Sequence, residues 1–335
     1  MSSKCDFVIN GKKIRARLGD TLLNAALVGG VALPHDCNTG QCDTCRVRVY
    51  SGNVDDNGTG RRDTVLACQA TVIGEAVIEF DEVPEPSKSG ARVTSVLKLT
   101  PDIFAVSLIL DKKLTHLPGQ YVKVAFAGFP ARDYSPTVPL DGVVDDRTLI
   151  LHIRVEPDGV VSSDLGRAIR EGTRASVHGP FGNSFHRRGD GRIILVSSGT
   201  GFAPIWAIAR ASRFREPQRE MIISVGTRRA HNLYMREELK WLASTGVQGI
   251  TLTCSGPHSD ISILSGRPTA HLPPLESSDT IFCAGAPAMV SAVEILADAA
   301  GATCYSDAFL PAEPSRPWRQ RLASLVRHQF SGTAA

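Results

Sequence analysis

Four cysteines place the strongest constraint on what this chain can fold into. Cys37, Cys42 and Cys45 form a C-x4-C-x2-C pattern, and Cys68 follows further along the chain. This spacing is typical of a [2Fe–2S] cluster, whose two irons need four thiolates in a small volume. Gly40 lies in the first gap, where the backbone must curl close to the cluster. Zinc is the alternative, but zinc sites usually pair two C-x2-C units and the second pair is missing.

Length and composition indicate a globular protein with more than one domain. The chain has 335 residues, which suggests two or three domains at the usual ~100–200 residues each. A net charge of +3 gives no case for nucleic-acid binding. No stretch approaches the ~18 uninterrupted apolar residues of a transmembrane span. The N-terminus lacks a signal-peptide layout, so we expect a cytoplasmic protein with reduced thiols.

Proline and glycine divide the chain. Residues 83–90 are polar and proline-rich, as in a linker. Short alternating strands follow, a pattern typical of a small antiparallel barrel. From about Arg192, apolar runs alternate with helical stretches, which is typical of a parallel α/β sheet. We predict a cluster-binding domain over 1–84, a linker over 85–90, an antiparallel β-barrel over 91–188, a parallel α/β domain over 189–311 and a basic tail over 312–335.

The segment Arg132-Asp133-Tyr134-Ser135 has the side chains that hold a flat dinucleotide cofactor. An arginine can clamp a diphosphate with paired hydrogen bonds. A tyrosine two residues on lies on the same face of a strand and can stack on a ring. The serine next to it points the other way and can bond to a ring nitrogen. Alone, such a tetrapeptide is usually an ordinary strand.

Its surroundings make the tetrapeptide more informative. The spacing from Pro118-Gly119-Gln120-Tyr121 to Arg132-x-Tyr134-Ser135, and on to His152-Ile153-Arg154 and Gly159-x-x-Ser162, resembles the ferredoxin–NADP⁺ reductase family. The resemblance implies an FAD-binding barrel that ends near Gly179-Pro180-Phe181-Gly182. It also implies a short helix over 163–170, opened by Gly159 and Ser162, with N–H groups on the flavin diphosphate. The residues expected at FAD are Arg132, Tyr134, Ser135, His152, Ile153, Arg154, Gly159 and Ser162.

A second motif lies in the α/β domain. An apolar strand over 193–196 runs into Gly199-Thr200-Gly201-Phe202-Ala203-Pro204 and a helix to about Arg213. Strand, glycine turn and helix together place a diphosphate at a helix N-terminus. Pro204 stands where a Rossmann motif has its third glycine, and the reductase family uses G-T-G-x-A-P instead. We expect NAD(P)H to be held by Gly199, Thr200, Gly201 and Pro204, with Arg228 near the adenosine ribose.

Two later segments also resemble the family. Cys283-Ala284-Gly285-Ala286-Pro287 is similar to the C-G-x-P segment beside the nicotinamide, although a lone cysteine is more often a buried structural thiol. Asp307-Ala308-Phe309 is similar to a terminal acidic–x–Phe segment whose aromatic ring covers the flavin. A core phenylalanine is the alternative. The resemblance implies that Ser135, Cys283 and Phe309 take part in catalysis and that Gly285 lies at the nucleotide.

The order of the parts resembles the reductase components of bacterial ring-hydroxylating oxygenases of the naphthalene dioxygenase reductase type. The resemblance implies a β-grasp ferredoxin with [2Fe–2S], then FAD, then NADH, with NADPH left open. A flavin links a two-electron hydride donor to one-electron carriers. Electrons run downhill from a plant-type cluster near ~ −400 mV to a Rieske centre between ~ −150 and +300 mV. We expect an oxidoreductase of aromatic hydrocarbon catabolism that serves a Rieske ferredoxin or oxygenase component.

Other acceptors remain open at this point. A diiron monooxygenase or a sugar-dehydrase partner uses similar reductases, and a redox sensor without turnover is a further alternative. Arg228 and Arg229 suit a 2′-phosphate, but Asn232 and Tyr234 do not complete a phosphate clamp. The nicotinamide cofactor is therefore not settled by these residues.

Two features stand apart from the resemblance. Asp43 occupies a position where many relatives have glycine, so its carboxylate either adds negative charge near the cluster or points into solvent. In the tail, Trp318, Leu322, Leu325 and Val326 fall at helical spacing with arginines between them. This basic amphipathic helix is expected to pack on its own protein, to dock a partner or to contact a membrane surface.

Overall fold

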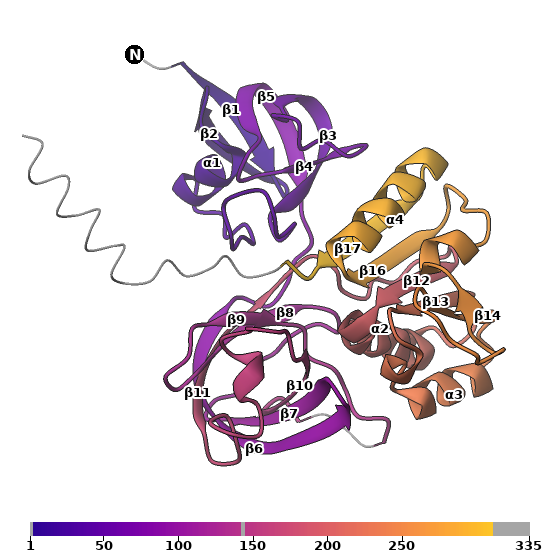
Figure 1. Ribbon diagram of the computed structural model, residues 1–335. Coiled ribbons are helices and arrows are strands. Elements are labelled where there is room, and N and C mark those ends of the chain that lie inside the picture. The colour runs from indigo at the N-terminus through magenta and orange to yellow at the C-terminus, as the bar shows by residue number, and fades with distance from the viewer. Residues whose placement is uncertain (1–2, 142–144, 311–335) are drawn as a thin grey trace, which may run out of the picture.

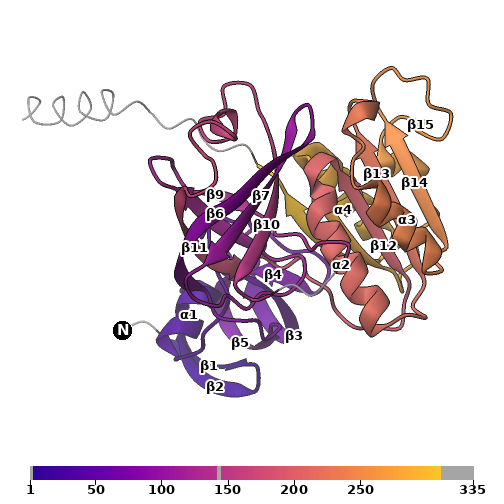
Figure 2. The same cartoon turned by 90° about the horizontal axis from the view of Figure 1, so that it is seen from below.

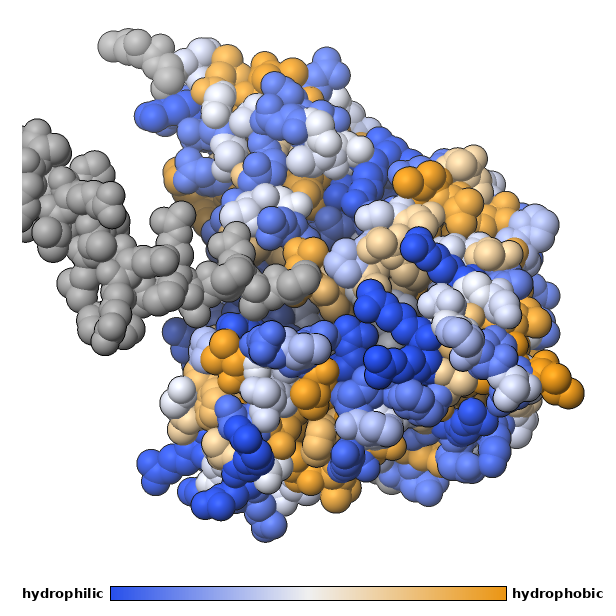
Figure 3. Space-filling model, in the orientation of Figure 1, coloured by the Kyte–Doolittle hydropathy of each residue, from blue (hydrophilic) through white to orange (hydrophobic). Residues whose placement is uncertain are grey.

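The computed structural model describes residues 3–141 and 145–310, which form three sheets in succession along the chain (Figure 1). The tail over 312–335 lies outside the described residues, and with it the expected amphipathic helix. Figure 3 shows a mixed surface in which hydrophilic residues are interspersed with small apolar groups over all three domains. None of the helices in the described residues is long and apolar enough to cross a membrane.

The first domain is a five-stranded mixed sheet with one helix, the predicted β-grasp arrangement. Its strands run in the order β2-β1-β5-β3-β4, and β1 and β5 are parallel. Helix α1 has Thr21 as its N-cap, which accepts the N–H of Asn24, and it buries four apolar side chains. The elements are β1 (Lys4–Ile9), β2 (Lys12–Arg17), α1 (Leu22–Val28), β3 (Arg46–Asp55), β4 (Thr64–Leu66) and β5 (Thr71–Glu79).

The second domain is the predicted antiparallel barrel. Its strands run in the order β10-β7-β6-β11-β8-β9, and a bridge between Thr137 and Ile150 brings the β9 edge back to β10. Alternate residues of each strand fill one apolar core, as the period of two requires. The strands are β6 (Ser87–Thr100), β7 (Ile103–Leu110), β8 (Tyr121–Phe126), β9 (Arg132–Tyr134), β10 (Thr148–Arg154) and β11 (Arg174–Phe181).

Two local expectations for the barrel are wrong. Ser87 to Gly90, expected in the linker, belong to β6, because Ser87 pairs with Gly179 of β11. The expected helix over 163–170 is only the 3-10 turn η1 (Ser162–Asp164). Leu165 then turns to an extended conformation and bridges Ile169, and Gly166 has a φ of +78°, so a helix cannot continue.

The third domain is the predicted parallel α/β sheet, with strand order β15-β14-β13-β12-β16-β17. Helices cover both faces (Figure 2), since Ile193 and Leu195 of β12 share a core with α2 and α3, whereas Ile194 and Val196 share one with α4. The elements are β12 (Ile193–Ser198), η2 (Gly199–Gly201), α2 (Phe202–Arg215), β13 (Met221–Thr227), η3 (Ala230–Asn232), α3 (Arg236–Ser244), β14 (Gly249–Cys254), β15 (Leu264–Ser265), η4 (Pro268–His271), β16 (Thr280–Gly285), α4 (Pro287–Ala300) and β17 (Thr303–Ala308).

Hydrogen bonds and ion pairs join the three domains to one another. Trp206 of α2 donates its indole N–H to the carbonyl oxygen of Val138, at 2.8 Å, which ties the α/β domain to the barrel. The loop between α1 and β3 contacts the barrel through Asp36, whose carboxylate lies 2.9 Å from Nζ of Lys123. Figure 1 shows β17 and α4 on the side of the α/β domain that faces the first domain.

Candidate cofactor sites

The four predicted cluster ligands converge at the base of the first domain. Cys37, Cys42 and Cys45 lie on the loop between α1 and β3, and Cys68 comes directly after β4. Gly40 has a φ of +82°, a left-handed conformation that glycine adopts readily and that lets the loop curl. A Cβ atom there would lie 3.2 Å from Cγ of Gln69, so the loop leaves little room for a side chain.

The thiols associate in two pairs. The backbone N–H of Cys37 lies 3.5 Å from Sγ of Cys42, and the thiols of Cys45 and Cys68 hydrogen-bond each other. Among the described residues, no three His, Cys, Asp or Glu side chains gather as a single metal ion would need. Two pairs fit two irons with two thiolates each, and do not fit one tetrahedral zinc.

In the pair nearer the surface, burial raises the pKa of Cys42, and only Cys37 is prepared for the thiolate form. Burial raises the pKa of Cys37, but hydrogen bonds from Thr39, with further ones from Cys42 and the N–H of Gln41, outweigh it and lower that pKa to about 7. Burial dominates at Cys45 and raises its pKa, because only 3% of this residue is exposed. N–H groups aimed at Sγ of Cys37 also suit a cluster whose sulfurs carry negative charge.

Asp43 does not point into solvent. It has a φ of +52°, and its carboxylate is only 16% exposed. Arg46 lies 3.1 Å from one carboxylate oxygen, and Arg61 lies 3.4 Å from the other. The charge of Asp43 is therefore balanced by two guanidinium groups beside the cysteine loop.

The strand end that carries Ser135 meets the last strand of the α/β sheet. Oγ of Ser135 donates a 2.7 Å hydrogen bond to Oδ2 of Asp307 in β17. Burial raises the pKa of Asp307 to about 6, although the bond from Ser135 lowers it, and nearby Asp133 raises it slightly. Our sequence reasoning missed Asp307, because it used the acidic–x–Phe segment only to place Phe309.

The other barrel residues surround the same strand end. Arg132 is half-buried and donates to the carbonyl oxygen of Ala131, and burial raises the pKa of Tyr134. Nδ1 of His152 lies 3.2 Å from the hydroxyl of Tyr234, and burial lowers the pKa of this imidazole to about 4. His152 is therefore neutral at pH 7. Ile153, the residue after His152, faces the barrel core.

The segment that follows β10 lies next to the nucleotide turn. A Cβ atom on Gly199 would lie 3.6 Å from Nη1 of Arg154, so this arginine spans the gap between barrel and α/β domain. Arg154 also pairs with Glu156. Gly159 is required where it stands, because a Cβ atom would lie 2.3 Å from Oγ of Ser162. That hydroxyl accepts the N–H of Glu156, which holds the turn closed.

The glycine turn after β12 packs tightly against the end of β16. A Cβ atom on Gly201 would lie 2.1 Å from the carbonyl oxygen of Ala284, and one on Gly285 would lie 2.4 Å from that of Ser198. Gly199 and Gly285 also have positive φ values. Thr200 lies between Gly199 and Gly201, and Pro204 is buried in the first turn of α2. These constraints explain why glycines stand here, at the carboxyl ends of parallel strands where ligands bind.

Cys283 lies on the wrong face of β16 for the expected role. It is fully buried with apolar residues under α4, and its Sγ lies 3.9 Å from that of Cys304. Ala284, the next residue, pairs with Asp307 and shares its face. Relative to a C-G segment, this chain has its cysteine one position early, which turns the thiol away from Ser135. The expectation that Cys283 contacts the nicotinamide is therefore wrong.

Phe309 continues β17 on the same face as Asp307. Its N–H donates to the carbonyl oxygen of Gly285 at 2.8 Å, and its ring is partly buried against the core that contains Phe202. It thus lies near the end of β16 and the Ser135 contact.

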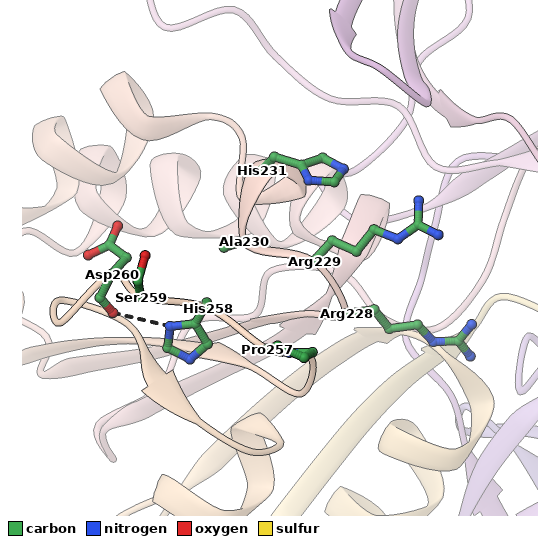
Figure 4. Close-up of a pocket in the computed structure, with 8 residues that line it drawn as sticks. All are labelled: Arg228, Arg229, Ala230, His231, Pro257, His258, Ser259 and Asp260. Atoms are coloured by element: carbon green, nitrogen blue, oxygen red, sulfur yellow. Dashed lines mark hydrogen bonds between the residues drawn. The ribbon is translucent and has the colours of Figure 1, made fainter.

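A pocket of about 440 Å³ opens beyond the ends of β13 and β14. Figure 4 shows Arg228 and Arg229 extending together, away from the loop that carries His258 and Asp260. Nδ1 of His258 lies 3.2 Å from the backbone oxygen of Asp260. Two arginines and two histidines against one aspartate favour an anionic ligand. The lining is Arg228, Arg229, Ala230, His231, Pro257, His258, Ser259 and Asp260.

The three domains match three family models in the same order. A 2Fe-2S iron-sulfur cluster binding domain covers residues 7–72, an oxidoreductase FAD-binding domain covers 91–186, and an oxidoreductase NAD-binding domain covers 195–294. The chain is 31% identical to the naphthalene 1,2-dioxygenase system ferredoxin–NAD(P)⁺ reductase component of Pseudomonas putida, over 90% of this chain and 97% of that one. It belongs to the ferredoxin–NAD(P)⁺ reductase family.

Two further relatives of this reductase work in other systems. It is 29% identical to the xylene/toluene monooxygenase electron transfer component of Pseudomonas putida, over 69% of each chain. The crystal structure of the Amycolatopsis cytochrome P450 reductase GcoB superposes with a TM-score of 0.66 at 28% identity, over 92% of this chain and 99% of that one. The reductase is thus an oxidoreductase that carries electrons from NAD(P)H through FAD and a [2Fe–2S] cluster.

Proposed function

We propose that this reductase supplies electrons to an aromatic-ring-hydroxylating system, either to a Rieske ferredoxin or to the oxygenase component itself. The observation that carries the proposal is the docking of the cysteine loop on the flavin barrel. Thr44, next to Cys45, accepts the N–H of Gly182 at 3.1 Å. The hydroxyl of Tyr121 donates to Asp36, next to Cys37, at 2.6 Å. A cluster in this loop therefore lies against the domain proposed to hold the flavin.

The flavin site is proposed at the end of β9. Arg132 supplies a cation for the diphosphate, Tyr134 a ring to stack on, and neutral His152 a wall that adds no charge. Gly159 and Ser162 shape the turn on the diphosphate side, and Ile153 packs behind it. When bound, the flavin accepts a hydride and releases electrons singly.

The nucleotide is proposed to lie along the carboxyl ends of β12, β13 and β16. The turn of Gly199, Thr200 and Gly201, followed by Pro204, exposes backbone N–H groups at the start of α2, where a diphosphate binds. Gly285 leaves room for the nicotinamide end. Arg228, in the cationic pocket, receives the adenosine end. Phe309 covers the flavin until the nicotinamide arrives.

Ser135 and Asp307 form the proton-holding pair of the site. The serine hydroxyl lies on a strand end next to Tyr134, and the carboxyl behind it has a pKa of about 6. Asp307 therefore exchanges a proton near neutral pH, and Ser135 connects that proton to the ring face.

The roles of the two redox sites are separated by a Cys68→Ser variant. It should lose the cluster and keep NADH-to-dye turnover, because dyes take electrons from the flavin directly. Metal and sulfide analysis of the unmodified protein should find two irons and two labile sulfides per chain. If dye reduction disappears while FAD stays bound, the proposed division of roles is wrong.

The acceptor is tested by reconstitution. The purified reductase, NADH and a candidate Rieske protein should together support oxidation of an aromatic substrate. A monooxygenase acceptor is the second candidate, favoured by the likeness to the xylene/toluene system component. Turnover with a diiron monooxygenase and none with Rieske proteins would replace the first acceptor by the second.

A further inference from the structure

Arg61 lies at the start of a tight turn that leads into β4. The backbone N–H of Arg61 donates to the carbonyl oxygen of Thr64 at 2.9 Å, and the reverse bond measures 3.0 Å. Only Arg62 and Asp63 lie between them. The hydroxyl of Thr64 also donates to the carbonyl oxygen of Arg61 at 2.8 Å. These bonds hold the Arg61 backbone, so its side chain starts from a defined place.

The guanidinium group of Arg61 lies between two carboxylates from different domains. Its Nη1 is 2.7 Å from Oε1 of Glu294 in α4 and 3.4 Å from Oδ2 of Asp43 in the cysteine loop. The two carboxylate side chains are each 16% exposed. Ion pairs at this depth are less screened by water and salt than pairs on the open surface.

Each carboxylate is itself held in place. Glu294 accepts a 2.6 Å hydrogen bond from the hydroxyl of Ser306 in β17. Asp43 is fixed by Arg46, whose side chain is 8% exposed and also donates to Thr64. The network thus runs without a break from the cysteine loop to the last strand of the α/β sheet.

Within residues 3–141 and 145–310, the contact between Arg61 and Glu294 is the only ion pair that joins the cluster domain to the α/β domain. The remaining polar contacts of the cysteine loop across a domain boundary go to the barrel, through Asp36 and Thr44. Figure 1 shows α4 and β17 facing β3 and β4 across this boundary. Glu294 is therefore the point at which the nucleotide side of the molecule holds the cluster domain.

Two neighbouring residues of β17 make the contact with Glu294 and the contact with Ser135. Ser306 points to the α4 face and bonds Glu294, whereas Asp307 points to the opposite face and accepts from Ser135. The docking contact and the flavin face are thus attached to one strand. A change in the position of β17 moves both.

We propose that Arg61 is a positioning residue that clamps the cluster domain against the α/β domain, so that the cysteine loop stays close to the flavin for electron transfer. The clamp consists of Asp43, Arg61 and Glu294. This inference rests on the proposed route from flavin to cluster, and it adds that the contact of the cluster domain with the α/β domain depends on the charge of Arg61.

The test uses the full-length protein loaded with FAD and cluster. Arg61→Ala is compared with Arg62→Ala, which removes the same charge from the same turn at an exposed residue. Three quantities are measured: the radius of gyration from small-angle X-ray scattering, the rate of cluster bleaching after anaerobic mixing with NADH, and NADH-to-dye turnover.

Arg61→Ala should enlarge the radius of gyration and slow cluster bleaching by roughly tenfold, in the range of coupling free energies measured for one partly buried ion pair. Dye turnover should not change, because the flavin and nucleotide sites are intact. Arg62→Ala should match the unmodified protein in all three. Arg61→Lys should restore most of the bleaching rate, since it keeps a positive charge between the carboxylates.

Glu294→Gln provides an independent variant outside the cluster domain. It should slow bleaching as Arg61→Ala does, and the double variant should be no slower than either single one, because both remove the same interaction. If Arg61→Ala fails to fold with its cluster, Glu294→Gln decides the question alone.

The clamp would be overturned if the Arg61 and Glu294 variants had the same radius of gyration and the same bleaching rate as Arg62→Ala and the unmodified protein. Such a result would leave the proposed function standing, provided that the unmodified protein bleaches its cluster with NADH. Failure of the unmodified protein to do so would instead refute the flavin-to-cluster route itself.

Discussion

Ser135 donates a 2.7 Å hydrogen bond to Asp307, although the two residues lie 172 positions apart in the chain. The contact joins the end of a barrel strand to the last strand of the parallel sheet. It places a carboxyl with a pKa of about 6 directly behind the serine proposed to face the flavin ring. The pair of Ser135 and Asp307 therefore exists only because the barrel and the α/β domain pack together.

Replacing Asp307 by asparagine should change how stability depends on pH. The pKa is raised from 3.8 to about 6, so the folded protein binds this proton more tightly than the unfolded chain. Stability from Asp307 is complete below about pH 4 and is lost as pH rises through about 6. A rise of this size in the pKa changes the free energy of unfolding by at most roughly 3 kcal/mol.

Melting temperatures of Asp307→Asn and the unmodified protein should therefore differ most at pH 8, with the variant more stable, and converge as pH falls to about 4. Ser135→Ala removes the bond that favours the charged carboxyl and should move the transition to higher pH. Parallel melting curves across this range would show that Asp307 does not titrate there.

Cys283→Ala should leave nicotinamide chemistry unchanged. The thiol is buried under α4, so its loss should lower the free energy of unfolding by about 1 kcal/mol through weaker packing. Flavin reduction by NADH, measured in single turnover, should stay at the unmodified rate. Ala284→Val is the contrasting variant, because it adds bulk on the Asp307 face and should slow that step. A large drop in hydride transfer with Cys283→Ala would reject our assignment of the faces.

Gly201→Ala should destabilise the α/β domain for a purely steric reason. Its φ of −59° suits alanine, but the new Cβ would lie 2.1 Å from the carbonyl oxygen of Ala284. Overpacking of this kind costs about 1–3 kcal/mol, and KM for NADH should rise as the turn shifts. Gly249→Ala is the matched control, since nothing lies within 4 Å of a Cβ there. Chemical denaturation of both variants checks the difference.

Arg132→Ala should weaken FAD binding. A charge-assisted hydrogen bond to a diphosphate contributes about 1.5–3 kcal/mol, so the variant should release flavin on dilution. Arg15→Ala, which removes an exposed arginine paired with Asp6 in the first domain, serves as the control. Flavin fluorescence in the filtrate after ultrafiltration measures the loss. Retention equal to the control would move the diphosphate contact to another residue.

Local patterns predicted the elements well where the pattern itself forms the contact. The apolar strand expected over 193–196 begins where β12 begins, and α1 begins after Thr21 and ends before Gly29, as its capping residues indicate. The start of β6 was missed, because Ser87 is a strand residue only through its pairing with Gly179. The prediction of a helix over 163–170 was wrong because Gly166 has a left-handed backbone conformation, which ends a helix.

By itself, the sequence determined the presence of a [2Fe–2S] domain, the glycine turn and the order of the three domains, and it predicted the four cysteine ligands, since each depends on residues that are close along the chain. Only the tertiary structure decided that Asp43 pairs with Arg61, that Asp307 meets Ser135 and that Cys283 faces α4. The reason is geometric. Spacing along a strand says which residues share a face, but the partner of that face depends on register and on domains that pack from distant parts of the chain.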